Sequence, residues 1–319
     1  MKAIIFDEAG EPSSVLRVAE ASVPPRDDGA ALVAVDARPL QPADMAFIRG
    51  RYRLQPIFPQ VAGLEGAGRI VDPGATGFAA GTRVAFRAPG SWAAQVAVPA
   101  DRLIVVPDDI PDDAACQISL NPLTALGLLD TAGIAPGDTM LITAAASTVA
   151  RIVTAICRAR GIATIGIVRT AASAALATTD TIFSADDPEL IDKLRGHTRA
   201  APPAGLLDSV GGPLVARLMP ALQPGARIVA YGVMDAAPAS VTNAALIYQN
   251  LTWIGFGIDR WLGALPAARR AELIDQLCAM LRDGSLQLPV AARFPLDNIH
   301  DALRADAAPG RSGKIILTS

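Results

Sequence analysis

The spacing of apolar and polar positions divides the chain near residue 111. Before that point, apolar and β-branched residues alternate or cluster in short runs separated by Pro and Gly turns, which is typical of strands. The runs are KAIIF (2–6), LRVAE (16–20), ALVAVDA (31–37), GAGRIVD (66–72), GTRVAF (81–86), WAAQVAVPA (92–100) and LIVVP (103–107). This pattern predicts an all-β, barrel-like unit.

After residue 111 the pattern predicts helices and strands in alternation. A helix is expected within 112–133, with acids in its first turn, followed by repeated strand–helix–strand units. The expected strands are 139–144, 163–169, 181–185, 204–210 and 226–232. Such repeats indicate a parallel sheet with helices on both faces. The last part adds a long amphipathic helix (266–284), two strands and a short helix, and we expect this tail to return to the first unit.

Composition excludes several classes of protein. Of the 319 residues, 51% are hydrophobic and 18% are charged, which indicates a globular chain with room for two domains. The net charge of -3 gives no general attraction to nucleic acid or to anionic membranes. The sequence has no apolar run of the kind found in signal peptides or membrane spans, so we expect a cytoplasmic protein.

Cysteine and histidine are too few and too scattered for a metal or disulfide framework. Cys116, Cys157 and Cys278 are far apart, and no CxxC motif occurs. His197 and His300 have no plausible partner near them in the sequence, and we interpret both as surface residues. We therefore expect no metal site.

The order of the elements and several sequence stretches resemble the medium-chain dehydrogenase/reductase superfamily over the whole chain. The stretches are ARPLQPADMAFIRGRY, PQVAGLEGAGRIV, QISLNPLTALGLL, PPAGLLDSVGG, RIVAYGVM and SGKIILT. The resemblance implies an α/β protein with two domains. A GroES-like β-barrel domain is expected over 1–117, completed by 259–319. A Rossmann domain with a doubly wound parallel sheet is expected over 118–258.

Within that superfamily the chain is similar to zinc-free reductases. Leu64 stands where zinc-dependent members have a histidine, and the first domain lacks their cysteine. Two branches compete, the quinone oxidoreductases and the mitochondrial-type 2-enoyl thioester reductases. The stretches PADMAFIRGRY and NPLTA look like the second branch. The resemblance then implies reduction of an activated C=C bond, with quinone reduction as the alternative.

Tyr52 is the candidate catalytic residue that this resemblance implies. Hydride addition to the β-carbon of a 2-enoyl thioester leaves negative charge on the thioester oxygen, which a phenol can stabilise while it supports proton delivery. A loop tyrosine lying on the barrel surface is the alternative. Arg49, Arg51 and Arg53 flank Tyr52, and on an extended segment they would share a face. They would then meet the phosphates of coenzyme A or an acidic acyl carrier protein, or else lie solvated at the surface.

The implied cofactor is NADPH. Arg169 ends the second expected strand of the Rossmann domain, where the enoyl reductases hold the 2′-phosphate, and no acid stands there to bind an NAD ribose. The other residues at cofactor-binding positions of the family are Asn121, Thr124, Ser147, Thr148, Val149, Tyr231, Gly232, Val233, Met234, Phe256, Gly257, Ile258 and Lys314. A helix cap at Asn121, a plain strand-end turn at Tyr231 and an edge-strand lysine at Lys314 are the alternatives.

The cofactor loop itself departs from the family. Where the family has roughly Asn-Ser-Gly-Val-Gly, this chain has Ala146-Ser147-Thr148-Val149-Ala150. Thr148 is unfavourable if that position needs a positive φ, although Ser147 and Thr148 are good N-cap residues for an anion-binding helix. The choice is therefore between a usable NADPH site and a non-catalytic, reductase-like binding protein. By resemblance we also expect a homodimer, with residues 239–257 as the interface strand.

Overall fold

The computed structural model describes residues 1–308 and 310–319. These residues form two compact units, and each is described by itself. The first comprises Met1–Leu120 and Leu277–Ser319, and the second comprises Asn121–Gln276. These units are defined by contacts within the structure. The domain boundaries expected from the sequence, at residues 117/118 and 258/259, remain a prediction.

The first unit is built on a seven-stranded sheet with the order β15-β16-β3-β5-β6-β8, in which β7 also pairs with β3. Its strands are β3 (Ala30–Pro39), β5 (Gly66–Asp72), β6 (Arg83–Phe86), β7 (Gln95–Pro99), β8 (Leu103–Val105), β15 (Val290–Pro295) and β16 (Lys314–Thr318). A smaller sheet joins β2 (Arg17–Glu20), β1 (Lys2–Phe6) and β4 (Gln60–Val61). Four α-helices complete the unit: α1 (Pro12–Val15), α2 (Pro42–Ile48), α3 (Asp112–Ala115) and α11 (Ile299–Ala307).

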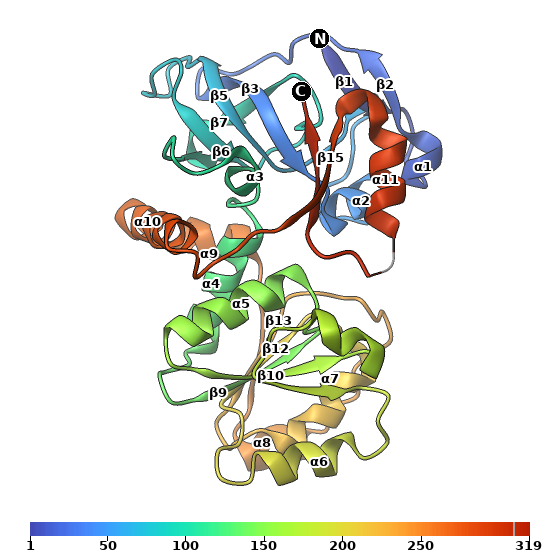
Figure 1. Ribbon diagram of the computed structural model, residues 1–319, viewed down its shortest axis with the longest axis vertical. Helices are drawn as coiled ribbons and strands as arrows, with labels where there is room; N and C mark the ends of the chain where they lie inside the picture. The colour runs from blue at the N-terminus through green and yellow to red at the C-terminus, as the bar shows by residue number, and fades with distance from the viewer. Residues whose placement is uncertain (309) are drawn as a thin grey trace. The chain divides into compact units, whose positions relative to one another are not determined.

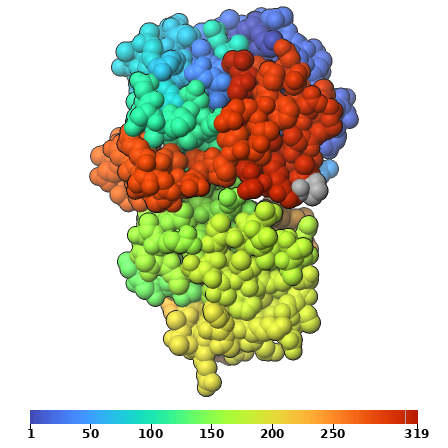
Figure 2. All heavy atoms as spheres, viewed as in Figure 1, coloured from blue at the N-terminus to red at the C-terminus, as the bar shows by residue number. Residues whose placement is uncertain are grey.

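The C-terminal residues Leu277–Ser319 are part of this first unit. β16 pairs antiparallel with β3, so that Ile316 lies opposite Pro39. Side chains from β16 and α11 join those of β1 and α2 in one buried apolar cluster. In the space-filling view the red C-terminal segment lies directly against the blue N-terminal residues of the same unit (Figure 2).

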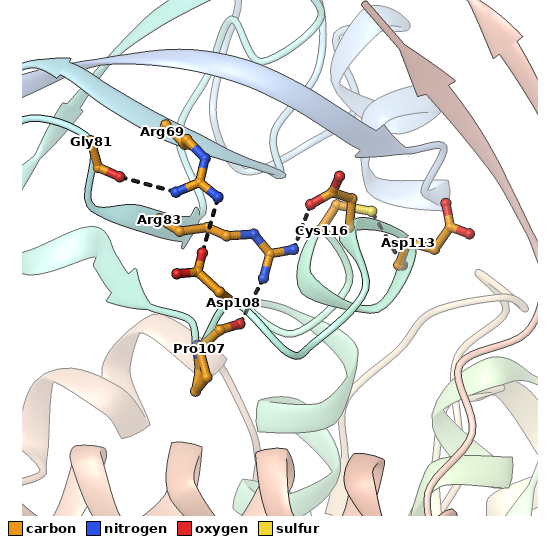
Figure 3. Close-up of polar contacts among 8 residues, drawn as sticks. Arg69, Gly81, Arg83, Pro107, Asp108, Asp113 and Cys116 are labelled. Carbon is orange, nitrogen blue, oxygen red and sulfur yellow. Dashed lines mark hydrogen bonds and ion pairs between the residues drawn. The ribbon is translucent and has the colours of Figure 1, made fainter.

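Four arginines hold the segment that leads out of the barrel. Asp108, Asp109, Asp112 and Asp113 each form an ion pair with a different arginine. Arg69 of β5 and Arg83 of β6 point at this segment side by side, and Arg83 also donates to the Pro107 carbonyl at 2.7 Å (Figure 3). The path of the chain towards residue 120 is therefore fixed on the first unit.

The second unit contains a six-stranded parallel sheet (Figure 1). Its order is β11-β10-β9-β12-β13-β14, which is the 3-2-1-4-5-6 order of a Rossmann fold. The strands are β9 (Thr139–Thr143), β10 (Ala163–Val168), β11 (Thr181–Ser184), β12 (Gly205–Asp208), β13 (Arg227–Ala230) and β14 (Thr252–Gly255). The expected doubly wound sheet is confirmed.

Helices pack on both faces of this sheet. On one face, α4 (Asn121–Ala132) and α5 (Thr148–Ala159) contact each other and the central strands. On the other, α6 (Leu190–His197) and α7 (Gly212–Leu218) bury leucine and valine side chains against the strands, together with residues of α8 (Asn243–Gln249). Two further helices follow. α9 (Ile258–Ala264) belongs to this unit, and α10 (Ala267–Arg282) begins in it and ends in the first unit, to which the chain returns at Leu277.

Two segments differ from what the sequence led us to expect. Residues 259–276 belong to the second unit rather than to the barrel. Trp261 explains part of this, because its Nε1 donates to Asp130 Oδ2 at 3.0 Å and its ring packs beside Phe256. The expected interface strand over 239–257 is also only partly a strand. Thr242 caps α8, which occupies 243–249, and the extended part is limited to β14.

Candidate active site

Tyr52 lies in a loop that the end of α2 holds in place. Gly50, with φ of 66°, takes the left-handed conformation that ends the helix. Its N–H donates to the Phe47 carbonyl at 3.0 Å, and the Arg51 N–H donates to the Ala46 carbonyl at 2.8 Å. These two hydrogen bonds are the Schellman motif, which sets the direction of the chain one residue before Tyr52.

The Tyr52 side chain packs at the edge of the apolar cluster of the barrel and is partly buried. The guanidinium carbon of Arg53 lies 5.5 Å from the centre of the Tyr52 ring, at cation–π distance. Arg49 forms an ion pair with Glu11 instead, since its Nε and Nη2 both donate to the carboxylate of Glu11, at 3.0 and 2.7 Å. The expectation that three arginines share one face of an extended segment is therefore wrong, since α2 ends at its cap Arg49 and the chain bends there.

Arg87 also belongs to the surroundings of Tyr52, and sequence reasoning missed it. It follows β6 directly and is half-buried, and its Nη1 donates to the Ser119 carbonyl at 2.9 Å. Burial lowers the pKa of Arg87, and the charge of Glu65 opposes this effect. A lone arginine immediately after a fully buried strand was the available sequence signal.

A chain of buried polar groups runs through the interior of the first unit. Lys314 Nζ donates to Gln41 Oε1 at 2.5 Å, and Gln41 Nε2 donates to Glu65 Oε2 at 2.9 Å. The Ser119 hydroxyl donates to the other oxygen of Glu65 at 2.9 Å. Lys314 is predicted to lie near the cofactor, and in the structure its amino group donates to Gln41 within this buried network.

Two carboxyl groups in this network have strongly altered acidity. Burial raises the pKa of Asp44 to about 8, with the charge of Glu65 adding to the rise while the backbone N–H of Gln41 opposes it. Burial also raises the pKa of Glu65, although hydrogen bonds from Gln41 and Ser119 and the charge of Lys314 oppose this. Burial lowers the pKa of Lys314. With a pKa of about 8, Asp44 keeps its proton at neutral pH.

In the second unit, the glycine-poor loop between β9 and α5 has a regular geometry. Ser147 is the N-cap of α5, and its Oγ accepts a hydrogen bond from the Ala150 N–H at 3.2 Å, as the sequence predicted. Thr148 is already helical, so the concern about a positive φ at that residue does not arise. Instead, Ala144 takes the left-handed conformation, with φ of 48°. A methyl group tolerates this conformation at a modest cost.

The carboxyl ends of β12 and β13 place more polar groups close to Ser147. Buried Asp208 accepts hydrogen bonds from the Thr143 hydroxyl at 2.8 Å and from the Gly211 N–H at 3.0 Å, which fixes the turn after β12. Burial raises the pKa of Tyr231 to about 12, and the nearby hydroxyls of Ser209 and Ser147 oppose the rise. Sequence reasoning singled out Tyr231 but missed Asp208 and Ser209. The available signal was a lone acid, Asp208, at the end of an apolar strand.

Gly232 allows the turn after β13 to lie close to the turn after β12. A Cβ atom at this residue would lie 2.6 Å from the Ser209 carbonyl oxygen, so that the turns after β12 and β13 could not approach each other with any larger residue. Val233 and Met234 follow with exposed side chains, 77% and 68% of their surface being accessible. The loop therefore presents backbone and two apolar side chains to solvent.

The remaining predicted residues lie on several elements of the second unit. Arg169 follows the buried end of β10 and is exposed, whereas Asn121 and Thr124 are buried in the first turns of α4. Val149 is half-buried in the first turn of α5. Phe256 and Gly257 connect β14 to α9, which begins at Ile258, and the ring of Phe256 packs close to Gly127 of α4.

These residues fit a dinucleotide cofactor. Ser209 Oγ and Tyr231 Oη are buried atoms without a hydrogen-bond partner among the described residues, and they lie at the carboxyl edge of the sheet. The first amides of α5 are free of intrahelical partners, as in any helix, and attract anions. Hydroxyl groups beside a helix N-terminus are the groups that phosphates and ribose hydroxyls need.

Two features of the described residues, 1–308 and 310–319, bear on other functions. They contain no group of three or more His, Cys, Asp or Glu side chains placed to hold a metal ion. They also contain no helix long and apolar enough to cross a membrane.

Two family models match parts of the chain. A family model described as the alcohol dehydrogenase GroES-like domain matches residues 27–108, and one described as a zinc-binding dehydrogenase matches residues 192–317. The mitochondrial enoyl-[acyl-carrier-protein] reductase of Xenopus tropicalis is 30% identical over 341 residues, covering 99% of this chain and 95% of that protein.

Solved structures match over the full length. The quinone oxidoreductase of Escherichia coli complexed with NADPH has a TM-score of 0.86 at 24% identity and covers 100% of both chains. A mycobacterial protein complexed with NADPH has a TM-score of 0.84 at 25% identity, again covering 100% of both chains.

Proposed function

Because this chain belongs to the medium-chain dehydrogenase/reductase superfamily, we propose that it is an NADPH-dependent reductase of activated C=C bonds, with 2-enoyl thioesters as its substrates. The chain is an oxidoreductase of the α/β type with a GroES-like domain and a Rossmann domain. The assignment of 2-enoyl thioesters as substrates is the proposal that goes beyond this classification.

The placement of Tyr52 is the observation that carries the proposal. Its loop is fixed by the Schellman motif at the end of α2, and its ring packs against the core of the barrel beneath Arg53. A tyrosine held in this way presents its hydroxyl in a restricted position. Preorganised donors of this kind stabilise developing negative charge far better than mobile ones.

The chemistry requires one hydride and one proton. Bound NADPH supplies the hydride that the β-carbon of the substrate receives. The Tyr52 hydroxyl donates a hydrogen bond to the thioester oxygen and so stabilises the enolate charge that develops there. A proton then reaches the α-carbon, with Tyr52 supporting its delivery, and the saturated thioester leaves.

The residues we assign to NADPH are those with free donors at the carboxyl edge of the second sheet. Ser147 and the first amides of α5 would hold the pyrophosphate, with the hydroxyls of Ser209 and Tyr231 beside them. Arg169, exposed after β10, would bind the 2′-phosphate that distinguishes NADPH from NADH. The remaining predicted cofactor residues are assigned by resemblance alone.

Quinones are the second candidate substrates. The observation that favours them is the close likeness of the whole fold to quinone oxidoreductases, against a higher sequence identity to enoyl reductases. A quinone accepts hydride without needing a fixed donor at a thioester oxygen. The two functions therefore differ in their dependence on Tyr52.

Three further features are part of the proposal. We assign a homodimer, formed through the edge strand β14 and helix α8 of the second unit. Exposed apolar side chains gather on these two elements, namely Ile247, Tyr248 and Trp253. The acyl group would arrive on coenzyme A or an acyl carrier protein, and we propose a cytoplasmic location.

NADPH oxidation measured side by side on crotonyl-type thioesters, simple enones and quinones tests the proposed function. We expect the highest kcat/KM with thioesters. A higher kcat/KM with quinones would favour the second candidate. Failure of NADPH to bind at millimolar concentration, followed by tryptophan fluorescence, would instead leave a non-catalytic binding protein.

A further inference from the structure

Asp44 is a buried acid that the proposed reaction does not use. It is the third residue of α2, its side chain is fully buried, and its Oδ2 accepts the backbone N–H of the helix cap Gln41 at 2.8 Å. A carboxylate in such a place has lost its hydration. The uncharged carboxyl is therefore the favoured form unless a cation pairs with it.

Two charged groups face Asp44 from neighbouring segments. Lys314, at the start of β16, donates its Nζ to Gln41 Oε1 at 2.5 Å, and Glu65, just before β5, accepts from Gln41 Nε2 at 2.9 Å. The charge of Glu65 disfavours ionisation of Asp44, and that of Lys314 favours it. The cation of this network thus bonds to an amide oxygen rather than to the Asp44 carboxyl.

The other elements packed around α2 contribute apolar side chains. Phe47 and Ile48 of α2 are fully buried in one cluster with residues of β1 and α11. The ring of Phe47 meets that of Phe6 edge-on, with 5.9 Å between the ring centres. Charge on Asp44 therefore meets no polar surroundings on this side of the helix.

α2 links Asp44 to the loop of Tyr52 through a short and continuous set of backbone hydrogen bonds. The helix has only seven residues. At its end the Gly50 N–H donates to the Phe47 carbonyl and the Arg51 N–H to the Ala46 carbonyl, one residue before Tyr52. A change in the first turn of α2 is therefore transmitted to the Tyr52 side chain.

We propose that Asp44 is a positioning residue for Tyr52. Its uncharged carboxyl holds the first turn of α2 in place, whereas its ionisation at alkaline pH releases that turn and displaces the Tyr52 hydroxyl. The rate of reduction then falls reversibly as pH rises. This inference rests on the proposed function and adds a control of the same site.

The physical cause is the cost of a buried charge. Burial raises the pKa of Asp44 to about 8, so the folded protein loses this proton only above that pH. The ionised carboxylate gains free energy by moving towards water, which draws the first turn of α2 away from the interior. A small movement is enough, because misplacing a catalytic group by about 1 Å costs roughly 10²-fold in rate.

The pH dependence of crotonyl-thioester reduction tests this assignment. For the wild type we expect kcat to fall about tenfold from pH 7 to pH 9, with KM nearly unchanged, because about a tenth of the molecules keep the Asp44 proton at pH 9. Asp44→Asn carries a neutral group of the same shape and should change less than twofold. Asp101→Asn, at an exposed acid, should follow the wild type. A flat wild-type profile, or an equal fall in Asp44→Asn, would overturn the inference.

Tyr52→Phe separates positioning of the hydroxyl from an effect on the whole barrel. The variant keeps the ring that packs against the buried cluster but lacks the group whose position Asp44 controls. Its residual kcat should therefore vary less than threefold over the same pH range. A tenfold fall that persists in Tyr52→Phe would show that Asp44 acts on another group, and the assignment to Tyr52 would be wrong.

Nuclear magnetic resonance follows Tyr52 without any turnover. The chain has three tyrosines, so ring-13C-tyrosine labelling gives few signals, and the one missing in Tyr52→Phe belongs to Tyr52. In the wild type this signal should shift with a midpoint near pH 8, whereas in Asp44→Asn it should not. Tyr248, which is 86% exposed on α8, should show no such midpoint in either protein.

This titration also separates the inference from the proposed function. If no thioester is reduced, the proposed function fails, and the Tyr52 signal alone decides whether Asp44 controls its position. A Tyr52 signal that stays constant between pH 7 and pH 9 in the wild type would overturn the inference, even if Asp44→Asn does not fold.

Discussion

The backbone N–H of Gln41 donates a hydrogen bond of 2.8 Å to Oδ2 of Asp44, a carboxyl group that is fully buried. This pair begins α2 as a capping box, and the same helix ends at the loop that carries Tyr52. The N-cap of one short helix thus joins the buried acid network of the barrel to the candidate catalytic residue.

The first prediction concerns pH. The pKa of Asp44 is about 8 in the folded protein, above its ordinary value of about 3.9 in an unfolded chain. Between these values the folded state retains a proton that the unfolded state has lost, so stability falls as pH rises. The slope for this one group approaches about 1.4 kcal/mol per pH unit.

Asp44→Asn should flatten that part of the pH dependence. Urea unfolding at pH 5, 6, 7 and 8 measures it, with the exposed variant Asp101→Asn as the control. The free energy of unfolding of Asp44→Asn should decline less steeply over this range than that of the wild type or the control. Identical slopes in all three proteins would contradict a protonated Asp44.

The second prediction concerns charge balance between Lys314 and Glu65. Lys314→Met removes a cation that acts on Glu65 and leaves the buried Gln41 oxygen without its donor, which should cost about 1–3 kcal/mol of stability. Adding Glu65→Gln removes the opposing charge as well. The double variant should therefore lose less stability than the sum of the single variants.

Chemical unfolding of the wild type, both single variants and the double variant gives the coupling free energy. We expect a coupling above about 1 kcal/mol, as found for residues in one network. Single effects that add within about 0.5 kcal/mol would mean that the two charges act independently.

The third prediction concerns cofactor choice. Arg169→Ala should weaken NADPH binding by about 1.5–3 kcal/mol and leave NADH binding nearly unchanged, because only NADPH carries the 2′-phosphate. Dissociation constants from fluorescence titration measure this. Arg195→Ala, at an exposed arginine of α6 in the same unit, serves as the control. A similar loss for both cofactors would remove Arg169 from the phosphate site.

The fourth prediction concerns assembly. Ile247, on α8, has 69% of its surface exposed and lies near the edge strand β14. We expect a dimer at micromolar concentration by sedimentation, and a monomer for Ile247→Asp, because a charge at an apolar interface is strongly unfavourable. Val71→Asp, at an exposed apolar residue of the first unit, should remain dimeric. A monomeric wild-type protein would contradict the proposed interface.

Local patterns in the sequence predicted the parts of the fold that depend on residues close together in the chain. Apolar alternation located the strands of the parallel sheet, and the serine before an apolar run located the cap of α5 at Ser147. Trp261 shows the limit of this reasoning, because its hydrogen bond to Asp130 assigns a segment to the second unit although the two residues are 131 positions apart.

The surroundings of Tyr52 could not be predicted for the same reason. Arg87 and Ser119 reach that region only because the strands of the barrel close on one another. The acidity of Asp44 depends in turn on complete burial and on Glu65, which a sequence pattern does not reveal. Ala144 gave no signal either, since alanine rarely takes the left-handed conformation that the loop imposes on it.

Replacement of the Tyr52 hydroxyl tests the central claim most directly. Tyr52→Phe keeps the ring that packs against the barrel and under Arg53, so the fold and the binding of substrate should change little. Only the hydrogen bond to the developing enolate oxygen is lost. With a crotonyl-type thioester and NADPH we predict that kcat and kcat/KM fall together by about 10²–10³, with KM and melting temperature nearly unchanged. A fall of less than about threefold, or a change confined to KM, would contradict the account.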